Sequence, residues 1–154
     1  MRRLCAAAIS MTVYVSGWAI SSCQAAENLR MREGISFLHD LDQGFPIVAD
    51  HIDDIALASG KPTLLFFGAS GDLNTNRQAK RIVDLYKKFK SDAVKFVIID
   101  VDNAGSAPAK AMIKNYYSGY IPAQLLFDKQ GKVKWNHTGE VDIAVIAAQI
   151  DKLL

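Results

Sequence analysis

The stretch IPAQLLFDKQGK occupies residues 121–132 and predicts the first strand and the turn of a β-hairpin. Gln124–Phe127 is a mainly apolar run of strand length, and Lys132–Trp135 alternates charged and apolar residues. The segment between them, Asp128–Gly131, is polar and contains a glycine, as is typical of a hairpin turn. The stretch therefore predicts two antiparallel strands, the first of which follows Pro122.

Two further strands are predicted before the hairpin. Thr63–Phe67 is a continuous apolar run between Pro62 and Gly68, and Val94–Val101 is a second apolar run. Such runs are typical of strands that are covered on both faces of a sheet. Because a helix-length segment separates the two strands, the connection favours a parallel pair.

Apolar residues at helical spacing predict three helices around these strands. The helices cover Thr75–Phe89, a segment from Ser106 to Tyr116 or Tyr117, and residues 143–154. The order from Thr63 onwards is strand, helix, strand, helix, hairpin, helix. This order predicts an α/β fold with a mixed β-sheet and helices on both faces.

Residues 24–48 are expected to form a helical N-terminal extension. Residues 27–41 mix charged residues with apolar ones at spacings that favour an amphipathic helix. After the break at Gly44–Pro46, a second helical pattern runs from about Ile47 to Ser59. The main domain is then expected over residues 49–154.

The first 23 residues are typical of a secretion signal. Two arginines near the start precede an uncharged, mainly apolar stretch that ends at Ile20. Two kinds of processing stay open. Ile20–Cys23 resembles a bacterial lipobox, in which Cys23 is lipidated, and Cys23–Ala25 fits an ordinary signal-peptidase site. We therefore expect export to the periplasm, with membrane attachment through a lipid on Cys23 as one of the two outcomes.

Charge gives no support for a nucleic-acid partner. The whole chain has 18 Lys and Arg against 16 Asp and Glu, and removal of residues 1–23 takes away two arginines and leaves 16 of each. A domain without net charge lacks the field that attracts a phosphate backbone. The acidic residues and the histidine at positions 50–54 fit a solvated helix face better than a metal site. We therefore expect no cofactor.

From about Asp50 to Leu154 the chain resembles the thioredoxin-like fold family. Ser59–Pro62, which leads into an apolar strand, resembles exported members of this family, and residues 121–132 are the more specific match. In the family this second segment carries a cis-proline that opens a strand. The resemblance therefore implies a cis bond between Ile121 and Pro122.

The chain departs from the family at the redox motif, because its only two cysteines both lie before residue 24. In the family a Cys-x-x-Cys motif at a helix N-terminus supplies the reactive thiolate. An ungapped match places the two cysteines at Asp72 and Thr75, on either side of Leu73 and Asn74. The buried acid of classical members falls at Phe66. The resemblance therefore implies a redox-inactive member without a catalytic residue.

Two surfaces compete as the functional site. Asp and Thr are favoured helix N-caps, so that capping explains Asp72 and Thr75 without a ligand, although a polar site there stays open. By resemblance, the backbone of Ile121 before Pro122 holds an extended peptide as an added strand. Tyr120 suits such an interface because it joins an apolar ring to a polar tip. The alternative is that Pro122 only shapes the fold and that the tyrosines cover the core.

We therefore expect a protein-binding, peptide-binding or assembly module of the cell envelope, whose partner is an envelope protein or an extended peptide segment. One alternative is an accessory to thiol–disulfide chemistry in which the partner supplies every cysteine. Another is a purely structural subunit of an envelope complex. All three share the same expected fold and the same expected export.

Overall fold

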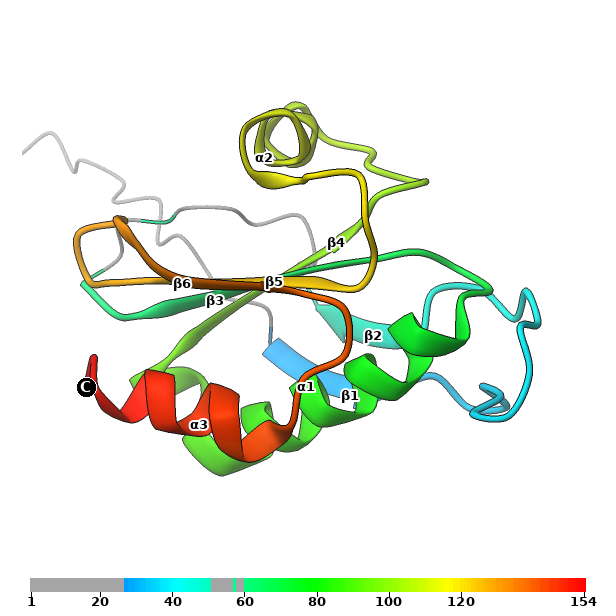
Figure 1. Cartoon of the computed structure of the whole chain (residues 1–154), viewed down its shortest axis with the longest axis horizontal. Coiled ribbons are helices and arrows are strands. Elements are labelled where there is room, and N and C mark those ends of the chain that lie inside the picture. Colours follow the sequence, from blue (N-terminus) through cyan, green and yellow to red (C-terminus); the bar gives the residue numbers. More distant parts are fainter. Residues whose placement is uncertain (1–26, 51–56, 58–59) are drawn as a thin grey trace, which may run out of the picture.

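The computed structural model describes residues 27–50, 57 and 60–154, and in these residues it contains a four-stranded sheet, a two-stranded sheet and three helices. The four-stranded sheet has the order β4-β3-β5-β6. Figure 1 shows this sheet almost edge on, with helix α2 on one face and helices α1 and α3 on the other. The elements are β3 (Thr63–Gly68), α1 (Leu73–Ala93), β4 (Lys95–Asp100), α2 (Ala107–Tyr116), β5 (Ala123–Phe127), β6 (Val133–Thr138) and α3 (Ile143–Asp151).

Strand β3 lies inside the sheet, and all its residues are buried. It pairs with β4 in parallel and with β5 antiparallel. Its side chains alternate between two cores: Leu64 and Phe66 pack in the core that α1 and α3 cover, and Leu65 and Phe67 pack in the core that α2 covers. The predicted α/β fold with a mixed sheet is confirmed.

The three predicted helices are confirmed, with different ends. Helix α1 is longer at both ends than the predicted Thr75–Phe89. Helix α2 starts after Ser106, whose side-chain oxygen accepts a hydrogen bond from the Ala109 amide at 3.2 Å. Helix α3 starts after Asp142, whose carboxylate accepts one from the Ala144 amide at 2.7 Å. Both are ordinary N-caps.

The predicted helical N-terminal extension is wrong for the residues that the structure describes. Strands β1 (Glu27–Met31) and β2 (Ile47–Asp50) form an antiparallel pair, and turns and bends connect them. Leu29 is buried between exposed neighbours, which is the period of a strand. Leu29, Phe45 and Ile47 pack in the same core as α1, so that this packing outweighs the helical spacing of the apolar residues.

Parts of the N-terminal predictions fall on residues outside the described ranges. These are the secretion signal at residues 1–23 with Cys23, and the rest of the second predicted helix at 51–56 and 58–59. In the described ranges, none of the helices combines the length and the hydropathy that a membrane span requires.

The β5–β6 hairpin is confirmed, and Asp128 organises its turn. The Asp128 carboxylate accepts hydrogen bonds from the amides of Gln130 and Lys132 at 3.0 and 2.9 Å, and it lies 3.3 Å from the Lys134 ammonium. The hydrogen bond from the Lys132 amide is the main reason why the pKa of Asp128 is lower than usual, and burial opposes it.

We expect Asp128→Asn to make the fold less sensitive to acid. A carboxyl group whose pKa is lowered by folding stabilises the fold above its unfolded pKa of about 4, and this contribution is lost as the pH falls through the folded pKa. The difference in Tm between pH 7 and pH 3, measured by circular dichroism, should therefore be smaller in the variant. The exposed Glu33 provides the control, since Glu33→Gln should keep the wild-type difference. An unchanged difference in Asp128→Asn would contradict the assignment.

Candidate functional site

The structure brings the two sequence-predicted surfaces to one end of the sheet. Phe67 of β3 lies opposite Ala123 of β5, so that the next residues, Gly68 and Pro122, lie beside each other. Gly68 leads into the turn before α1 (Figure 1). Helix α1 begins at Leu73, directly after Asp72. The peptide bond between Ile121 and Pro122 is cis.

Asp72 is the N-cap of α1. Its carboxylate accepts a hydrogen bond from the Thr75 amide at 2.6 Å, and its backbone carbonyl accepts one from the Asn76 amide at 3.0 Å. This is the capping role that the sequence allowed. The carboxylate is therefore engaged with its own helix.

Thr75 is fully buried and does not face a binding surface. Its hydroxyl oxygen accepts a hydrogen bond from the Ala69 amide at 3.4 Å. Its methyl group packs against Gly68, where an added Cβ would lie 2.5 Å from Thr75 Cγ2. Thr75, which stands where the family has its second cysteine, therefore connects the end of β3 to α1. Its side chain is not available to a ligand.

A segment between β1 and β2 covers the start of α1, and we call residues 36–42 the strap. The Asp40 carboxylate accepts a hydrogen bond from the Leu73 amide at 2.8 Å. The Ser36 carbonyl accepts one from the Asn76 side chain at 3.0 Å. The first amides of a helix have no partner within the helix. Here Asp40 and Asp72 satisfy two of them, so that the strap occupies part of the helix mouth.

The strap makes polar contacts with α1 and exposes apolar side chains. Phe37, Leu38 and Leu41 are 37, 76 and 49% exposed. Tyr120, in the loop before β5, is 70% exposed. Several large apolar side chains are thus exposed on the strap and on the loop before β5, a feature that is typical of an interaction surface.

Ile121 and Pro122 differ in how their backbone is used. The Pro122 carbonyl accepts a hydrogen bond from the Gly139 amide at 2.7 Å. Ile121 is half-buried, and among the described residues no hydrogen bond to its backbone amide or carbonyl is found. That an added strand pairs with the backbone of Ile121, which the resemblance implied, stays a prediction.

Two buried glutamines fix the loop that follows β6. The Gln78 side-chain oxygen accepts hydrogen bonds from the Val141 amide at 3.0 Å and from Arg81 at 2.9 Å. The Gln124 side chain donates to the Gly139 carbonyl at 3.3 Å. Arg81 also lies 2.7 Å from Glu140. These contacts hold the loop on α1, next to the loop that contains Pro122.

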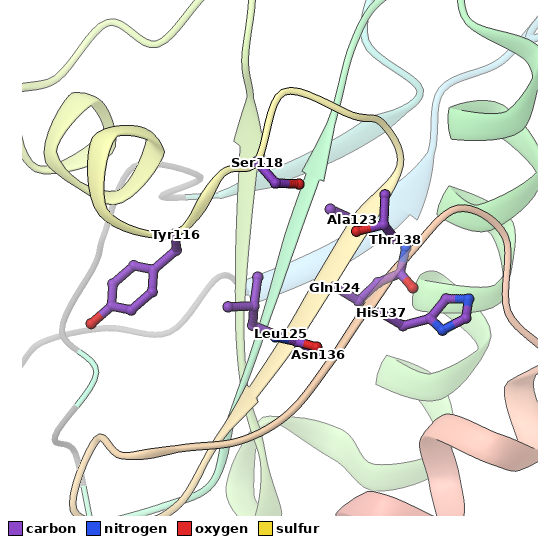
Figure 2. Close-up of a pocket in the computed structure, with 8 residues that line it drawn as sticks. All are labelled: Tyr116, Ser118, Ala123, Gln124, Leu125, Asn136, His137 and Thr138. Atoms are coloured by element: carbon purple, nitrogen blue, oxygen red, sulfur yellow. The ribbon is translucent and has the colours of Figure 1, made fainter.

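A small pocket lies beside the end of β6, and sequence reasoning did not find it. It has a volume of about 130 Å³. Figure 2 shows that Leu125 and Asn136 lie on the side of α2, that Ser118 points from the loop after α2 toward Ala123 and Thr138, and that His137 points away from α2. The lining residues are Tyr116, Ser118, Ala123, Gln124, Leu125, Asn136, His137 and Thr138. The polar ones among them are common surface residues, and nothing in their spacing indicates a pocket.

The chemistry available at the start of α1 is limited to oxygen and amide groups. No cysteine lies in residues 24–154. In the described ranges, no three side chains of the metal-binding types gather closely enough to hold a metal ion. Within the described ranges, the start of α1 therefore presents neither a thiol nor a metal-binding cluster.

We expect Gly68→Ala to destabilise the fold by about 2 kcal/mol, because overpacking a close contact typically costs 1–3 kcal/mol. Thr75→Ser removes the methyl group that the new Cβ would meet, so that the double variant should recover much of this loss. Urea unfolding measures both. Gly105→Ala is the control, since a Cβ there meets nothing within 4 Å. Equal stability of Gly68→Ala and Gly105→Ala would contradict the packing described.

A comparison of the sequence with protein-family models and with curated proteins finds no match. Solved structures do match. A malarial protein is 16% identical, with a TM-score of 0.52 over 61% of this chain and 98% of its own. Fasciola hepatica thioredoxin is 18% identical, with a TM-score of 0.51 over 63% of this chain and 85% of its own. Mitochondrial thioredoxin 3 from Saccharomyces cerevisiae is also 18% identical, with a TM-score of 0.51 over 63% and 83%. The chain therefore has a thioredoxin-like fold.

Proposed function

We propose that the chain is an exported, redox-inactive thioredoxin-like module that binds an extended segment of a partner in the cell envelope. This proposal rests on which groups accept the hydrogen bonds of the first amides of α1. Carboxylates of the chain itself, from Asp40 and Asp72, occupy its amides, whereas Tyr120 and the backbone of Ile121 nearby are open. A surface of this kind is suited to binding and not to catalysis.

The absence of a thiol in the domain argues against redox chemistry. Thiol–disulfide exchange proceeds by attack of a thiolate on a disulfide sulfur. The positions that carry the cysteines in the family hold a capping Asp72 and a buried Thr75 in this chain. The alternative in which a partner supplies every cysteine would benefit from free amides at the helix start, but Asp40 and Asp72 already accept from two of them.

The partner segment is expected to be extended and partly apolar. An extended segment forms main-chain hydrogen bonds with an exposed backbone, here that of Ile121, while its side chains contact neighbouring side chains. Tyr120 and the exposed strap residues Phe37, Leu38 and Leu41 supply apolar area for these contacts. In this proposal Asp72 and Thr75 support the surface and do not touch the partner.

Export and anchoring are part of the proposal and rest on residues 1–23. Mass spectrometry of the mature N-terminus distinguishes the two kinds of processing. We expect either an acylated Cys23 or a free N-terminus at Ala26, and the first result supports an anchor in the membrane. A mature chain that still begins at Met1 would overturn the proposed export.

Photo-crosslinking tests the binding surface. With benzoylphenylalanine in place of Tyr120, the full-length chain in its own cells should give a defined covalent adduct. The same probe at Lys110, an exposed residue of α2, serves as the control and should give none. Ile121→Asp should abolish the adduct, because a carboxylate disfavours an apolar contact that excludes water. Equal adducts from both positions, in a protein with normal circular dichroism, would contradict the proposed surface.

An insulin-reduction assay tests the redox part separately. The chain should reduce insulin no faster than the buffer with dithiothreitol, whereas a thioredoxin with its Cys-x-x-Cys motif should accelerate the reaction. Acceleration by a Cys5→Ser, Cys23→Ser variant would overturn the redox-inactive assignment. It would leave the binding surface at Tyr120 to be judged by the crosslinking result.

A further inference from the structure

We propose that the chain pairs with a second copy of itself through the free edge of β6, so that one sheet continues across two chains. This inference does not depend on the proposed function, and it uses the opposite side of β6 from the one that pairs with β5. It rests on the exposure of the edge, on the direction of its backbone groups and on the self-complementary order of its residues.

Strand β6 is the exposed edge of the four-stranded sheet. The edge strands are β4 and β6. Every residue of β4 is buried except the half-buried Asp100, whereas none of β6 is buried. An exposed edge presents unpaired amides and carbonyls and is a template for another strand.

The direction of the free backbone groups follows from one hydrogen bond. The Gly139 amide donates to the Pro122 carbonyl at 2.7 Å. In an antiparallel ladder, hydrogen-bonded pairs alternate with pairs that are not hydrogen-bonded. Moving along the ladder from Gly139, His137 therefore bonds to β5, while Asn136 and Thr138 turn their amides and carbonyls outward. These two residues are the natural contacts for an added strand.

The order of residues in β6 suits an antiparallel copy of itself with the twofold axis at His137. Asn136 then lies opposite Thr138 of the second copy, and each pair forms two main-chain hydrogen bonds. The side chains of this pair, an amide and a hydroxyl, are able to hydrogen-bond across the two strands.

A shift by two residues gives a poorer match. With the axis at Asn136, Thr138 would have to pair with Lys134 of the second copy. Lys134 lies where the β5–β6 register shifts, between the pairs of Leu126 and Phe127, and such an irregularity disturbs the ladder. The register centred on His137 uses the regular part of β6.

The two faces of the sheet beside this edge also suit a second copy. On the α2 face, Asn136 and Thr138 line the pocket of about 130 Å³ together with Ser118 (Figure 2). The second copy's Thr138 and Asn136 would lie beside these polar groups. On the other face, His137 stacks on Trp135 with 5.9 Å between ring centroids, and it would meet the second copy's His137.

Helix α3 carries an apolar exposed side on the same face as Trp135. Ala144, Val145 and Ala148 are all exposed, and Val145 is 45% exposed. Across a continuous sheet, the second copy's α3 would lie on this same face.

Disulfide trapping tests the register. In the full chain with Cys5→Ser and Cys23→Ser, His137→Cys should crosslink to a dimer under mild oxidation. Residues opposite each other in a pair that is not hydrogen-bonded have Cα atoms about 4.5 Å apart, within disulfide range. Asn136→Cys alone should not crosslink, but a mixture with Thr138→Cys should give the mixed dimer. Crosslinking of Asn136→Cys alone and none of His137→Cys would overturn the proposed register.

Sedimentation velocity at pH 8 over a range of concentrations tests the pairing without cysteines. We expect a reversible dimer. Asn136→Pro removes one outward amide from each copy and should raise the dissociation constant about tenfold or more, since two hydrogen bonds are lost. The fold should tolerate proline there because this amide makes no bond to β5, and circular dichroism checks this. Asn136→Ala keeps the amide and should change the constant about threefold or less. A wild-type chain that stays monomeric, or an Asn136→Pro variant that dimerises like the wild type, would overturn the proposal.

Discussion

The hydrogen bonds at the start of α1 are the constraint on which the rest of this end of the molecule depends. A helix leaves its first amides without internal partners, and the group that satisfies them decides what the helix mouth can do. In this chain Asp72 and Asp40 do so, one from the helix itself and one from the strap. The strap that is held there exposes Phe37, Leu38 and Leu41, and Tyr120 in the loop before β5 is exposed as well.

The main elements of the fold could be predicted because their signals are local. The apolar runs that form β3 and β4 are bounded by proline, glycine or charged residues. Because both faces of these strands are buried, their residues are apolar at successive positions and do not alternate with polar ones. The turn at Asp128 carries its own hydrogen-bonding side chain. The segment at 27–41 is different. Its apolar residues fit a helix, but the contact of Leu29 with the core around α1 selects a strand, and such a contact has no local signature.

The sequence-predicted site residues lie at one end of the sheet, and their role as a binding site stays a prediction. What their side chains contact depends on residues far away in the sequence. Asp72 is the cap that its residue type favours. The burial of Thr75 follows from the close approach of Gly68, and the closure of the helix mouth comes from Asp40, which lies 33 positions before Leu73. The edge of β6 was missed for another reason. Its second half, Asn136–Thr138, is polar throughout, and a polar segment gives no sign of whether the outer side of the strand is paired.

The two proposed surfaces use different interactions: the surface at Tyr120 contacts a partner, and the edge of β6 pairs with a second copy. Both can therefore be used at the same time. The surface at Tyr120 combines one open backbone position with exposed apolar side chains, and such a small contact area gives weak binding on its own. Pairing through β6 would present two such surfaces on one particle. Two weak contacts on one rigid body bind a multivalent partner far more tightly than either contact alone, provided that the spacing of the partner's segments matches. The surface at Ile121 offers few groups that contact a partner. A module without catalytic groups would therefore obtain most of its affinity from pairing with a second copy.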